Sequence, residues 1–306
     1  PLFHPGPSPT LFGRIGVTET LKKHPWLAYQ APLGVLGLFL MGDRLVAKHD
    51  IVVSNWTLPC GLLGALWKHR YGKPHMLIEH GGGIRALDGL PDSLRRPLGR
   101  FIFRNTEVIQ AVSSRIEERI SSYSSASKIR HRPAGFHPCK STNRGRTDGR
   151  KILFLARLVR QKGCDLLLEA MQILPDSYSA SIIGDGPRKR QLERLAIELG
   201  LTNRVRFTGE LSFQELCPVI NKHDIAVFPY RALKTGEEGT PTALLKSMSA
   251  GVVPIVSKAG GQTDLVQDGV NGLVLADCTG RELARQIVLL GETAGLIARM
   301  SARAAA

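Results

Sequence analysis

The sequence GEEGTPTALLKSMSAGVVPIVSKAGG, from Gly236 to Gly261, predicts a loop, a helix and a buried strand in direct succession. Thr240 is a good N-cap, Pro241 stands where a helix tolerates proline, and residues 242–250 are compatible with a helix. Residues 252–257 then form a short apolar strand. A helix start of this kind presents unpaired backbone N–H groups and the positive end of the helix dipole, which suits a diphosphate. The cap alone is weak evidence for a ligand, since most capped helices bind none.

Outward from this stretch, short apolar strands alternate with helical segments along the chain. The predicted strands are residues 50–54, 75–80, 107–112, 128–132, 151–155, 179–183, 205–207, 225–228, 253–256 and 272–275. Alternation of this kind is typical of parallel, doubly wound sheets. The polar and basic stretch 138–150 marks a linker. We therefore predict an α/β protein with two Rossmann-like, doubly wound domains, residues 1–140 and 141–306.

The composition is that of a soluble enzyme, with 43% hydrophobic residues in a chain of 306. The five cysteines are scattered with no C-x-x-C pair, which predicts neither a zinc knuckle nor a disulfide framework, so a reducing cytoplasm is the simplest location. The most apolar stretch, residues 31–41, is too short to span a membrane. We interpret it as a buried or membrane-facing helix and favour burial in the core.

The charge of the chain is concentrated in its first half. Residues 1–150 hold 22 Lys and Arg against 10 Asp and Glu, which is +12 of the total +15. A basic first domain favours contact with an anionic molecule or an anionic membrane leaflet. Nucleic acid is not expected as a partner, because only 6% of residues are aromatic and no nucleic-acid motif is present.

Four stretches, in order along the chain, carry a resemblance to a known family. Residues 50–83 contain a strand, a P-x-G-L-L-G helix and a second strand that ends in His-Gly. Residues 151–169, KILFLARLVRQKGCDLLLE, contain R-x(4)-K-G, and residues 181–209 contain a G-x-G-P turn between a strand and a helix. With residues 236–261, these stretches resemble the retaining, nucleotide-sugar-dependent glycosyltransferases of family 4. Members of that family have an E-x(7)-E region and the B-type fold, so the resemblance implies two Rossmann-like domains that face a cleft.

This resemblance implies an activity. A hexosyl group would pass from a nucleoside-diphosphate sugar to a hydroxyl of a glycan or a lipid-linked acceptor, with retention at the anomeric carbon. The resemblance implies no metal ion and no cofactor besides the donor substrate, and no D-x-D motif is present. In this family the first domain faces the acceptor, so its basic charge favours an anionic acceptor. The expected location is the cytoplasm, from the cysteine pattern, with peripheral contact at an anionic membrane, from the charge of the first domain.

The resemblance also assigns site residues by position. His80 and Glu238 match the residues that approach the transferred sugar, and they are the catalytic candidates. Arg157 and Lys162 match the residues that neutralise the diphosphate. The remaining donor-binding candidates match positions beside the diphosphate, the base or the sugar, and they are Gly186, Leu211, Gly239, Thr240, Pro241 and Thr242.

Two departures from the family leave alternatives open. The second glutamate of the E-x(7)-E region, which accepts hydrogen bonds from the ribose, is replaced by Lys246, and lysine accepts none. Its ammonium would instead reach toward the phosphates, or the donor would differ. The opening strand with its glycine-rich loop and the closing helix of the family are also missing from the sequence, so we expect a chain truncated at both ends. A degenerate, non-catalytic homologue and a nucleotide-sugar epimerase of the same fold are the alternatives.

Overall fold

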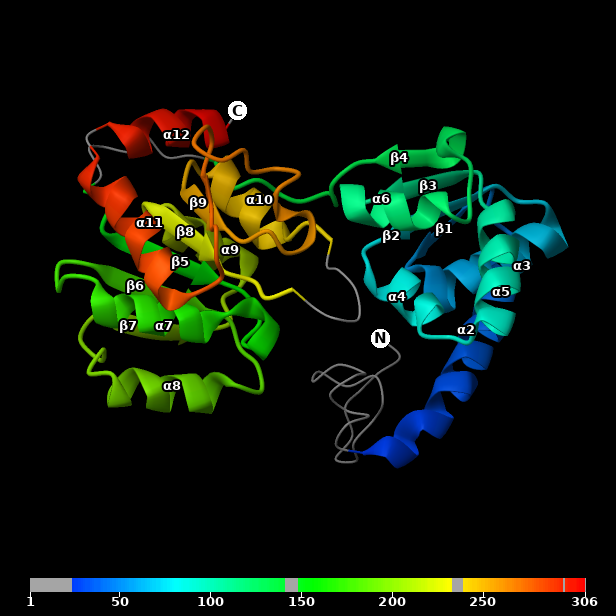
Figure 1. Ribbon diagram of the computed structural model, residues 1–306. Coiled ribbons are helices and arrows are strands. Elements are labelled where there is room, and N and C mark those ends of the chain that lie inside the picture. Colours follow the sequence, from blue (N-terminus) through cyan, green and yellow to red (C-terminus); the bar gives the residue numbers. More distant parts are fainter. Residues whose placement is uncertain (1–23, 141–147, 233–238, 294, 306) are drawn as a thin grey trace. The chain divides into compact units, whose positions relative to one another are not determined.

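The computed structural model describes residues 24–140, 148–232, 239–293 and 295–305 (Figure 1). By its contacts the chain divides into two compact units. Unit 1 comprises Pro1–Gln110 and Arg119–Arg130, and unit 2 comprises Ala111–Glu118 and His131–Ala306. The chain therefore contributes one short segment, Ala111–Glu118, to unit 2 before the long one. The predicted division at residue 140 stays a prediction.

Unit 2 is built on six strands with helices between them. The strands are β5 (Lys151–Leu155), β6 (Ser179–Ile183), β7 (Val205–Gly209), β8 (Ile225–Phe228), β9 (Val253–Val256) and β10 (Leu273–Val274). The helices are η4 (Arg160–Lys162), α7 (Cys164–Ile173), α8 (Lys189–Glu198), α9 (Phe213–Ile220), α10 (Thr242–Ser249), η5 (Gly260–Gln262), α11 (Gly280–Glu292) and α12 (Leu296–Ala304). The strands predicted at 151–155, 179–183, 225–228 and 253–256 are confirmed to the residue.

The strand order of this sheet is β10-β9-β8-β5-β6-β7, and every neighbouring pair is parallel. Counted from β5 as the first strand, the order is 3-2-1-4-5-6, the arrangement of a doubly wound Rossmann fold. The prediction of a Rossmann-like α/β unit is thereby confirmed. In such sheets the direction of winding reverses between the first and fourth strands, here β5 and β8, and ligands bind outside the carboxyl ends of the strands at that point.

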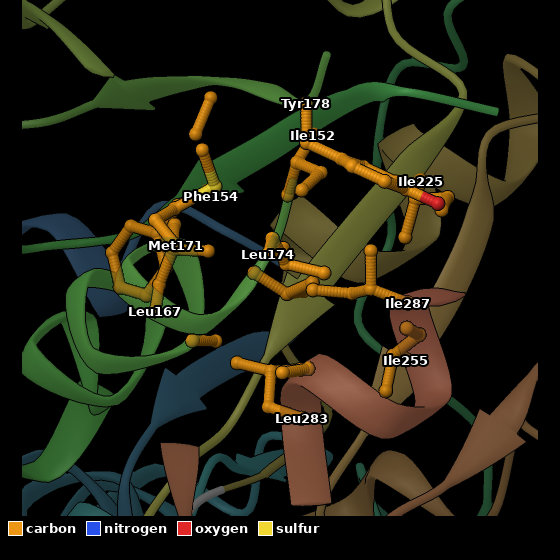
Figure 2. Close-up of a cluster of buried hydrophobic side chains, with 14 of the residues drawn as sticks. Ile152, Phe154, Leu167, Met171, Leu174, Tyr178, Ile225, Ile255, Leu283 and Ile287 are labelled. Atoms are coloured by element: carbon orange, nitrogen blue, oxygen red, sulfur yellow. The ribbon is translucent and has the colours of Figure 1, made fainter. Parts of the chain in front are cut away.

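Alternate residues of the strands supply two hydrophobic clusters, one on each face of the sheet. Ile152, Phe154 and Ile225 belong to the first cluster, together with residues of α7 and α11 (Figure 2). Leu153 and Phe228 belong to the second, with residues of α9 and α10. Strands buried on both faces read as continuous apolar runs, which explains why their limits were predictable.

Unit 1 holds most of a four-stranded sheet of order β1-β2-β3-β4. Its strands are β1 (Val52–Asn55), β2 (His75–Glu79), β3 (Val108–Ala111) and β4 (Ile129–His131), of which β1 and β2 are parallel. The helical segments in this part of the chain are η1 (Pro25–Tyr29), α2 (Gln30–Val46), η2 (Thr57–Gly61), α3 (Leu62–Tyr71), α4 (Gly82–Asp88), α5 (Asp92–Arg104), α6 (Ser114–Ser121) and η3 (Ala126–Lys128), and α6 belongs to unit 2 up to Glu118. Leu77, Ile84, Ile102 and Ile109 are fully buried in its core.

The apolar stretch 31–41 lies in α2, and its predicted burial is wrong. Leu33 and Leu40 are 60% and 58% exposed, and Leu36 and Met41 are about half exposed. Hydrophobicity alone predicted burial of this stretch, but the same apolar residues also occur on an exposed helix face. No helix in the described parts of the chain is long and apolar enough to cross a membrane.

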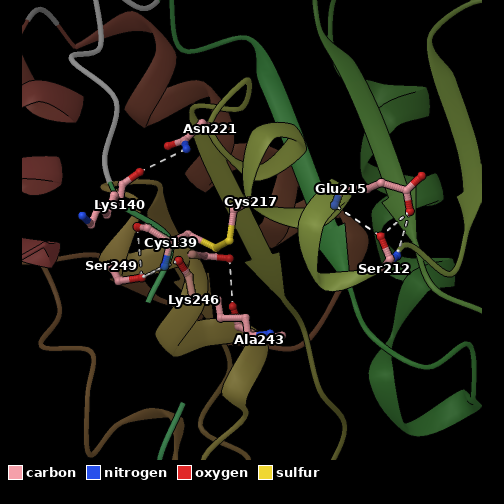
Figure 3. Close-up of a disulfide and its surroundings, with 10 residues drawn as sticks. Cys139, Lys140, Ser212, Glu215, Cys217, Asn221, Ala243, Lys246 and Ser249 are labelled. Atoms are coloured by element: carbon pink, nitrogen blue, oxygen red, sulfur yellow. Dashed lines mark hydrogen bonds between the residues drawn. A yellow bond between two sulfur atoms is a disulfide. The ribbon is translucent and has the colours of Figure 1, made fainter. Parts of the chain in front are cut away.

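The absence of a disulfide framework, expected from the cysteine spacing, is also corrected. Cys139 and Cys217 form a disulfide across 78 residues (Figure 3). The bond ties the segment that precedes β5 to helix α9. The backbone N–H of Cys139 also donates a hydrogen bond, 3.0 Å long, to Oγ of Ser249, the last residue of α10. Spacing alone does not show which distant cysteines meet. Because disulfides are rare in reducing compartments, the cysteines no longer argue for a reducing cytoplasm.

Candidate functional site

A lysine and an aromatic ring meet at the carboxyl ends of the neighbouring strands β5 and β8. Lys162 ends the short helix η4 that follows β5, and Tyr230 follows β8. The Nζ atom of Lys162 lies 3.8 Å from the centre of the Tyr230 ring, which is almost fully buried. Arg157, five residues before Lys162, is exposed on the same loop. The loop after β5 thus places positive charge at the carboxyl ends of the strands, at the switch point of the sheet, where the sequence analysis expected it. Tyr230 was not among the predicted residues.

The backbone conformation and the close packing of this loop require a glycine at position 163, directly after Lys162. Its φ is +70°, in the left-handed region that favours glycine. A Cβ atom added there would lie 2.1 Å from the carbonyl oxygen of Pro229, the residue between β8 and Tyr230. Any larger residue would push the loop off the end of β8. Gly163 therefore sets the close approach that brings Lys162 over the Tyr230 ring.

A partly buried ion pair holds the same loop. Asp165, in the first turn of α7, accepts two hydrogen bonds from the guanidinium of Arg231, at 2.8 and 3.0 Å. Arg188 lies 3.5 Å from the same carboxylate. Burial raises the pKa of Asp165, but hydrogen bonds and charge from Arg231, with charge from Arg188, outweigh it and hold that pKa below its usual value. Arg231 also donates to the carbonyl of Arg160 in η4, so the ion pair fixes the loop that carries Lys162.

The predicted G-x-G-P turn packs against the loop of Arg157. The N–H of Leu158 donates to the carbonyl of Asp185 at 2.8 Å. A Cβ atom on Gly186 would lie 2.6 Å from the carbonyl oxygen of Leu158. Because Gly186 has no side chain, the turn can pack against the backbone of Leu158, the residue that follows Arg157.

The start of α10 differs from the prediction in one detail. Thr240 is not the N-cap. Its buried hydroxyl donates instead to the carbonyl of Val112, at 2.8 Å, and to that of Gly261, at 3.3 Å. The N-cap is Pro241, and within the described residues no side chain caps the N-terminal amides of α10, which begins at Thr242. Gly239 is partly buried and leads into this turn, whereas Glu238 lies outside the described residues.

Lys246 lies in the second turn of α10, and its side chain reaches α9. Its Nζ atom is 4.8 Å from the centre of the Phe213 ring. Figure 3 shows Lys246 on α10 beside the Cys139–Cys217 disulfide. Leu211, two residues before Phe213, packs its side chain against the second hydrophobic cluster. The ammonium therefore has an aromatic partner on α9, a contact that the sequence did not indicate.

His80 belongs to unit 1 and follows β2. Its Nε2 atom lies 3.0 Å from Oδ1 of Asn55, and its ring meets that of Trp56 edge to face at 6.3 Å. Burial lowers the pKa of His80, and the charge of Glu79 offsets this only in part. The imidazole is therefore neutral at pH 7, as expected for a group that donates or accepts a hydrogen bond.

Glu79 is a buried carboxylate that organises the turn after β2. It is fully buried, and it accepts hydrogen bonds from the N–H and hydroxyl of Thr57, at 2.5 and 2.6 Å, and from the N–H groups of Gly81 and Gly83, at 2.6 and 3.2 Å. Four donors compensate the burial of this charge. The sequence analysis missed Glu79, although a carboxylate at an inward position of an apolar strand was a visible signal.

Within the described residues, no group of three or more His, Cys, Asp or Glu side chains is arranged to hold a metal ion. The absence of Glu238 from those residues means that one catalytic candidate is not placed. The independence from metal ions that the resemblance implies stays a prediction.

The fold and this edge define an α/β protein with a Rossmann-like unit whose switch point carries basic side chains. Residues 140–306 match the family described as glycosyl transferases group 1, and the chain belongs to this family. The match covers unit 2 from residue 140 onward and includes every candidate residue placed at the carboxyl ends of its strands.

Two relatives show the extent of the similarity. The chain is 25% identical over 280 residues to the uncharacterized glycosyltransferase MJ1178 of Methanocaldococcus jannaschii, with 88% of this chain and 72% of the relative covered. It is 30% identical over 251 residues to the GDP-mannose-dependent alpha-(1-6)-phosphatidylinositol monomannoside mannosyltransferase of Mycobacterium tuberculosis strain H37Rv. That alignment covers 76% of this chain and 64% of the mycobacterial enzyme, so the chain spans less than two thirds of the latter.

Solved structures share the fold. HepE of Anabaena, crystallised with UDP and glucose, superposes with a TM-score of 0.74 at 20% identity, covering 88% of this chain and 75% of HepE. Sucrose-phosphate synthase of Thermosynechococcus elongatus superposes with a TM-score of 0.70 at 19% identity, covering 88% of this chain and 73% of the synthase. These likenesses establish the glycosyltransferase B-type fold.

Proposed function

We propose that this protein is a retaining glycosyltransferase of family 4 that moves a hexosyl group from a nucleoside-diphosphate sugar to a hydroxyl group. The observation that carries the proposal is the placement of Arg157 and Lys162 at the switch point of the unit 2 sheet. Ligands of doubly wound sheets bind at that point. The mycobacterial relative is named as GDP-mannose-dependent, and the HepE structures contain UDP and UDP-glucose, which supports a nucleotide donor.

In the proposed reaction, positive charge stabilises the departing diphosphate. Arg157 would grip the phosphate oxygens, and Lys162 would act as a point charge held by the Tyr230 ring. The uncapped amides at Thr242 and the turn at Gly186 add donors from the backbone. Stabilisation of developing charge by groups already in place is the largest contribution to many enzymatic rates.

The proposed catalytic residues are His80 and Glu238. The neutral imidazole of His80 would contact the transferred sugar, and Glu238 would bind the sugar hydroxyls. Leu211 would flank the base through its backbone, because its side chain is committed to the hydrophobic cluster. Gly239, Thr240 and Pro241 would contribute backbone groups, since the hydroxyl of Thr240 is already bonded within unit 2. No metal ion is part of the proposal.

The proposed acceptor is a glycan or a lipid-linked saccharide. The mycobacterial relative is named for phosphatidylinositol monomannoside, an anionic lipid. The net charge of +12 over residues 1–150 favours an anionic acceptor and peripheral contact with an anionic leaflet. A cytoplasmic location belongs to the proposal, and the Cys139–Cys217 disulfide is the observation that weighs against it.

A thermal-shift titration with GDP and UDP tests the donor site. We expect one of them to raise the melting temperature and the substitution Arg157→Ala to abolish the rise. Arg194→Ala, on the middle of α8, is a control that removes one positive charge from the same unit. Equal shifts in wild type and Arg157→Ala would refute the donor site. Proton NMR of the product linkage, with a nucleotide sugar that binds, tests retention.

A degenerate, non-catalytic homologue is the second candidate, because Lys246 replaces a ribose-binding glutamate and already has an aromatic partner in Phe213. An epimerase of the same fold would release a free or nucleotide-bound isomer instead of a glycoside. Nucleotide binding without turnover would favour the degenerate homologue, and product analysis separates the epimerase.

A further inference from the structure

Unit 1 contains a basic pocket that the proposed donor site does not use. It has a volume of about 370 Å³. Its walls carry four arginines with one tyrosine and one aspartate, namely Arg95, Arg96, Arg100, Arg119, Tyr123 and Asp88. Three of the arginines come from α5, where residues 96 and 100 are one helical turn apart and therefore share a face. A hollow lined by so many guanidinium groups is suited to an anion.

The carboxylates near the pocket do not neutralise it. Asp88 is paired with Arg119. Asp92 pairs with Arg95, at 2.5 Å, and more distantly with Arg96, at 3.6 Å. Two carboxylates thus face four guanidinium groups, which leaves an excess of two positive charges.

Two of these arginines also have unused hydrogen-bonding capacity. The Nε atom of Arg95 is buried and has no hydrogen-bond partner within the described structure. Arg100 makes no ion pair or side-chain hydrogen bond with any residue that the structure describes. A buried donor without a partner costs free energy unless a ligand or water meets it. The Nε atom of Arg95 therefore points to a bound acceptor of hydrogen bonds, and the exposed guanidinium of Arg100 is available to the same ligand.

The aromatic wall of the pocket is held in place by close packing. The Tyr123 ring stacks on Phe103 with centroids 5.5 Å apart. It also lies directly against α5 at Gly99, where an added Cβ atom would be 2.6 Å from the ring. Gly99 therefore allows the tyrosine to approach the helix and sets the distance between the ring and the arginines. The wall is a built feature of unit 1.

We propose that this pocket binds a phosphate monoester attached to a small polar group, either a soluble sugar or polyol phosphate or the headgroup of a lipid. Guanidinium groups bind phosphate through paired hydrogen bonds, and an excess of two positive charges matches a phosphate dianion. A volume of about 370 Å³ lies in the range of small-molecule sites and exceeds what a bare phosphate needs. The inference does not rest on the proposed glycosyltransferase activity, because it shares no residue with the donor site.

Calorimetric titration of the full chain with glycerol 3-phosphate and with inorganic phosphate tests the soluble source. Flotation with phosphatidylcholine vesicles, with and without phosphatidic acid, tests the headgroup. We expect Arg100→Gln to weaken binding of whichever probe binds the wild type about tenfold or more, since charged hydrogen bonds are lost. Arg104→Gln is the matched control, because Arg104 is exposed on the same helix and does not line the pocket. It should change binding by less than about twofold.

The outcomes separate the sources. Binding of glycerol 3-phosphate that is lost in Arg100→Gln and kept in Arg104→Gln supports a soluble ligand, and the same pattern only with phosphatidic acid supports a headgroup. The binding must survive Arg157→Ala, which distinguishes this pocket from the donor site. Absence of binding by every probe, or equal loss in Arg100→Gln and Arg104→Gln, would overturn the proposal.

Discussion

The ammonium of Lys162 lies 3.8 Å from the centre of the buried Tyr230 ring, at the carboxyl ends of the neighbouring strands β5 and β8. The two residues are 68 positions apart in the sequence, and the parallel pairing of β5 with β8 brings them together. A cation over an aromatic face is stabilised by the ring and restricted in position. Tyr230 therefore holds the ammonium of Lys162 in the position from which, in the proposed function, it would meet a diphosphate.

Tyr230→Leu should weaken nucleoside-diphosphate binding about threefold to thirtyfold, because a cation over a ring contributes about 0.5–2 kcal/mol. Tyr230→Phe keeps the ring face and is the matched control, with most of the affinity retained. Titration calorimetry with the nucleotide that stabilises the wild type measures both. Equal affinities for the leucine and phenylalanine variants would show that the ring does not position Lys162.

Asp165→Asn should lower the free energy of unfolding by about 1–3 kcal/mol, because Arg231 then loses a partly buried anionic partner. The pKa of Asp165 is lowered in the folded protein, so its contribution is present above the ordinary pKa near 3.8 and is lost as the pH falls through the folded value. Urea denaturation at pH 7 and at pH 3 measures this. The difference between wild type and variant should shrink at the lower pH, and a difference independent of pH would contradict the assignment.

The sheet of unit 2 was predictable because its strands are buried on both faces. The runs KILFL at 151–155 and IAVF at 225–228 are apolar and bounded by turn residues, and each proved to be a strand with those limits. Arg157 and Lys162 were assigned from the family resemblance, and the loop that carries them follows such a strand. Tyr230, Asp165 and Arg231 were missed, since their contacts join residues that are far apart in sequence. No local pattern distinguishes an aromatic ring under a lysine from one in a core.

The same limit explains two wrong predictions. Leu33 and Leu40 were expected in the core because hydrophobicity does not say whether a neighbour covers the helix, and in α2 none covers them within the described residues. The hydroxyl of Thr240 was expected to cap α10, because threonine before proline is a usual start. It bonds instead to the carbonyl of Val112, a partner 128 residues away.

Removal of the disulfide should destabilise the protein. Cys139→Ser with Cys217→Ser is expected to lower the free energy of unfolding by about 2–4 kcal/mol, because the bond closes a loop across 78 residues. Cys278→Ser is a control, since this cysteine is free and only partly buried. Chemical denaturation with and without dithiothreitol measures the effect. Titration of the unfolded protein without reductant should find three thiols, and five would show that the bond does not form.

Lys246→Glu should tighten nucleotide binding about tenfold to a hundredfold, because a carboxylate that accepts hydroxyl bonds contributes about 1.5–3 kcal/mol. The reason lies in the resemblance, which puts a ribose-binding glutamate at this position. Lys246→Met is the matched control, since it removes the ammonium from the Phe213 ring without adding an acceptor. Calorimetry on the two variants separates the effect of the carboxylate from loss of the cation. If the methionine variant tightens binding as much as the glutamate variant, the ammonium itself opposes the nucleotide; if neither does, α10 is not the ribose-binding helix.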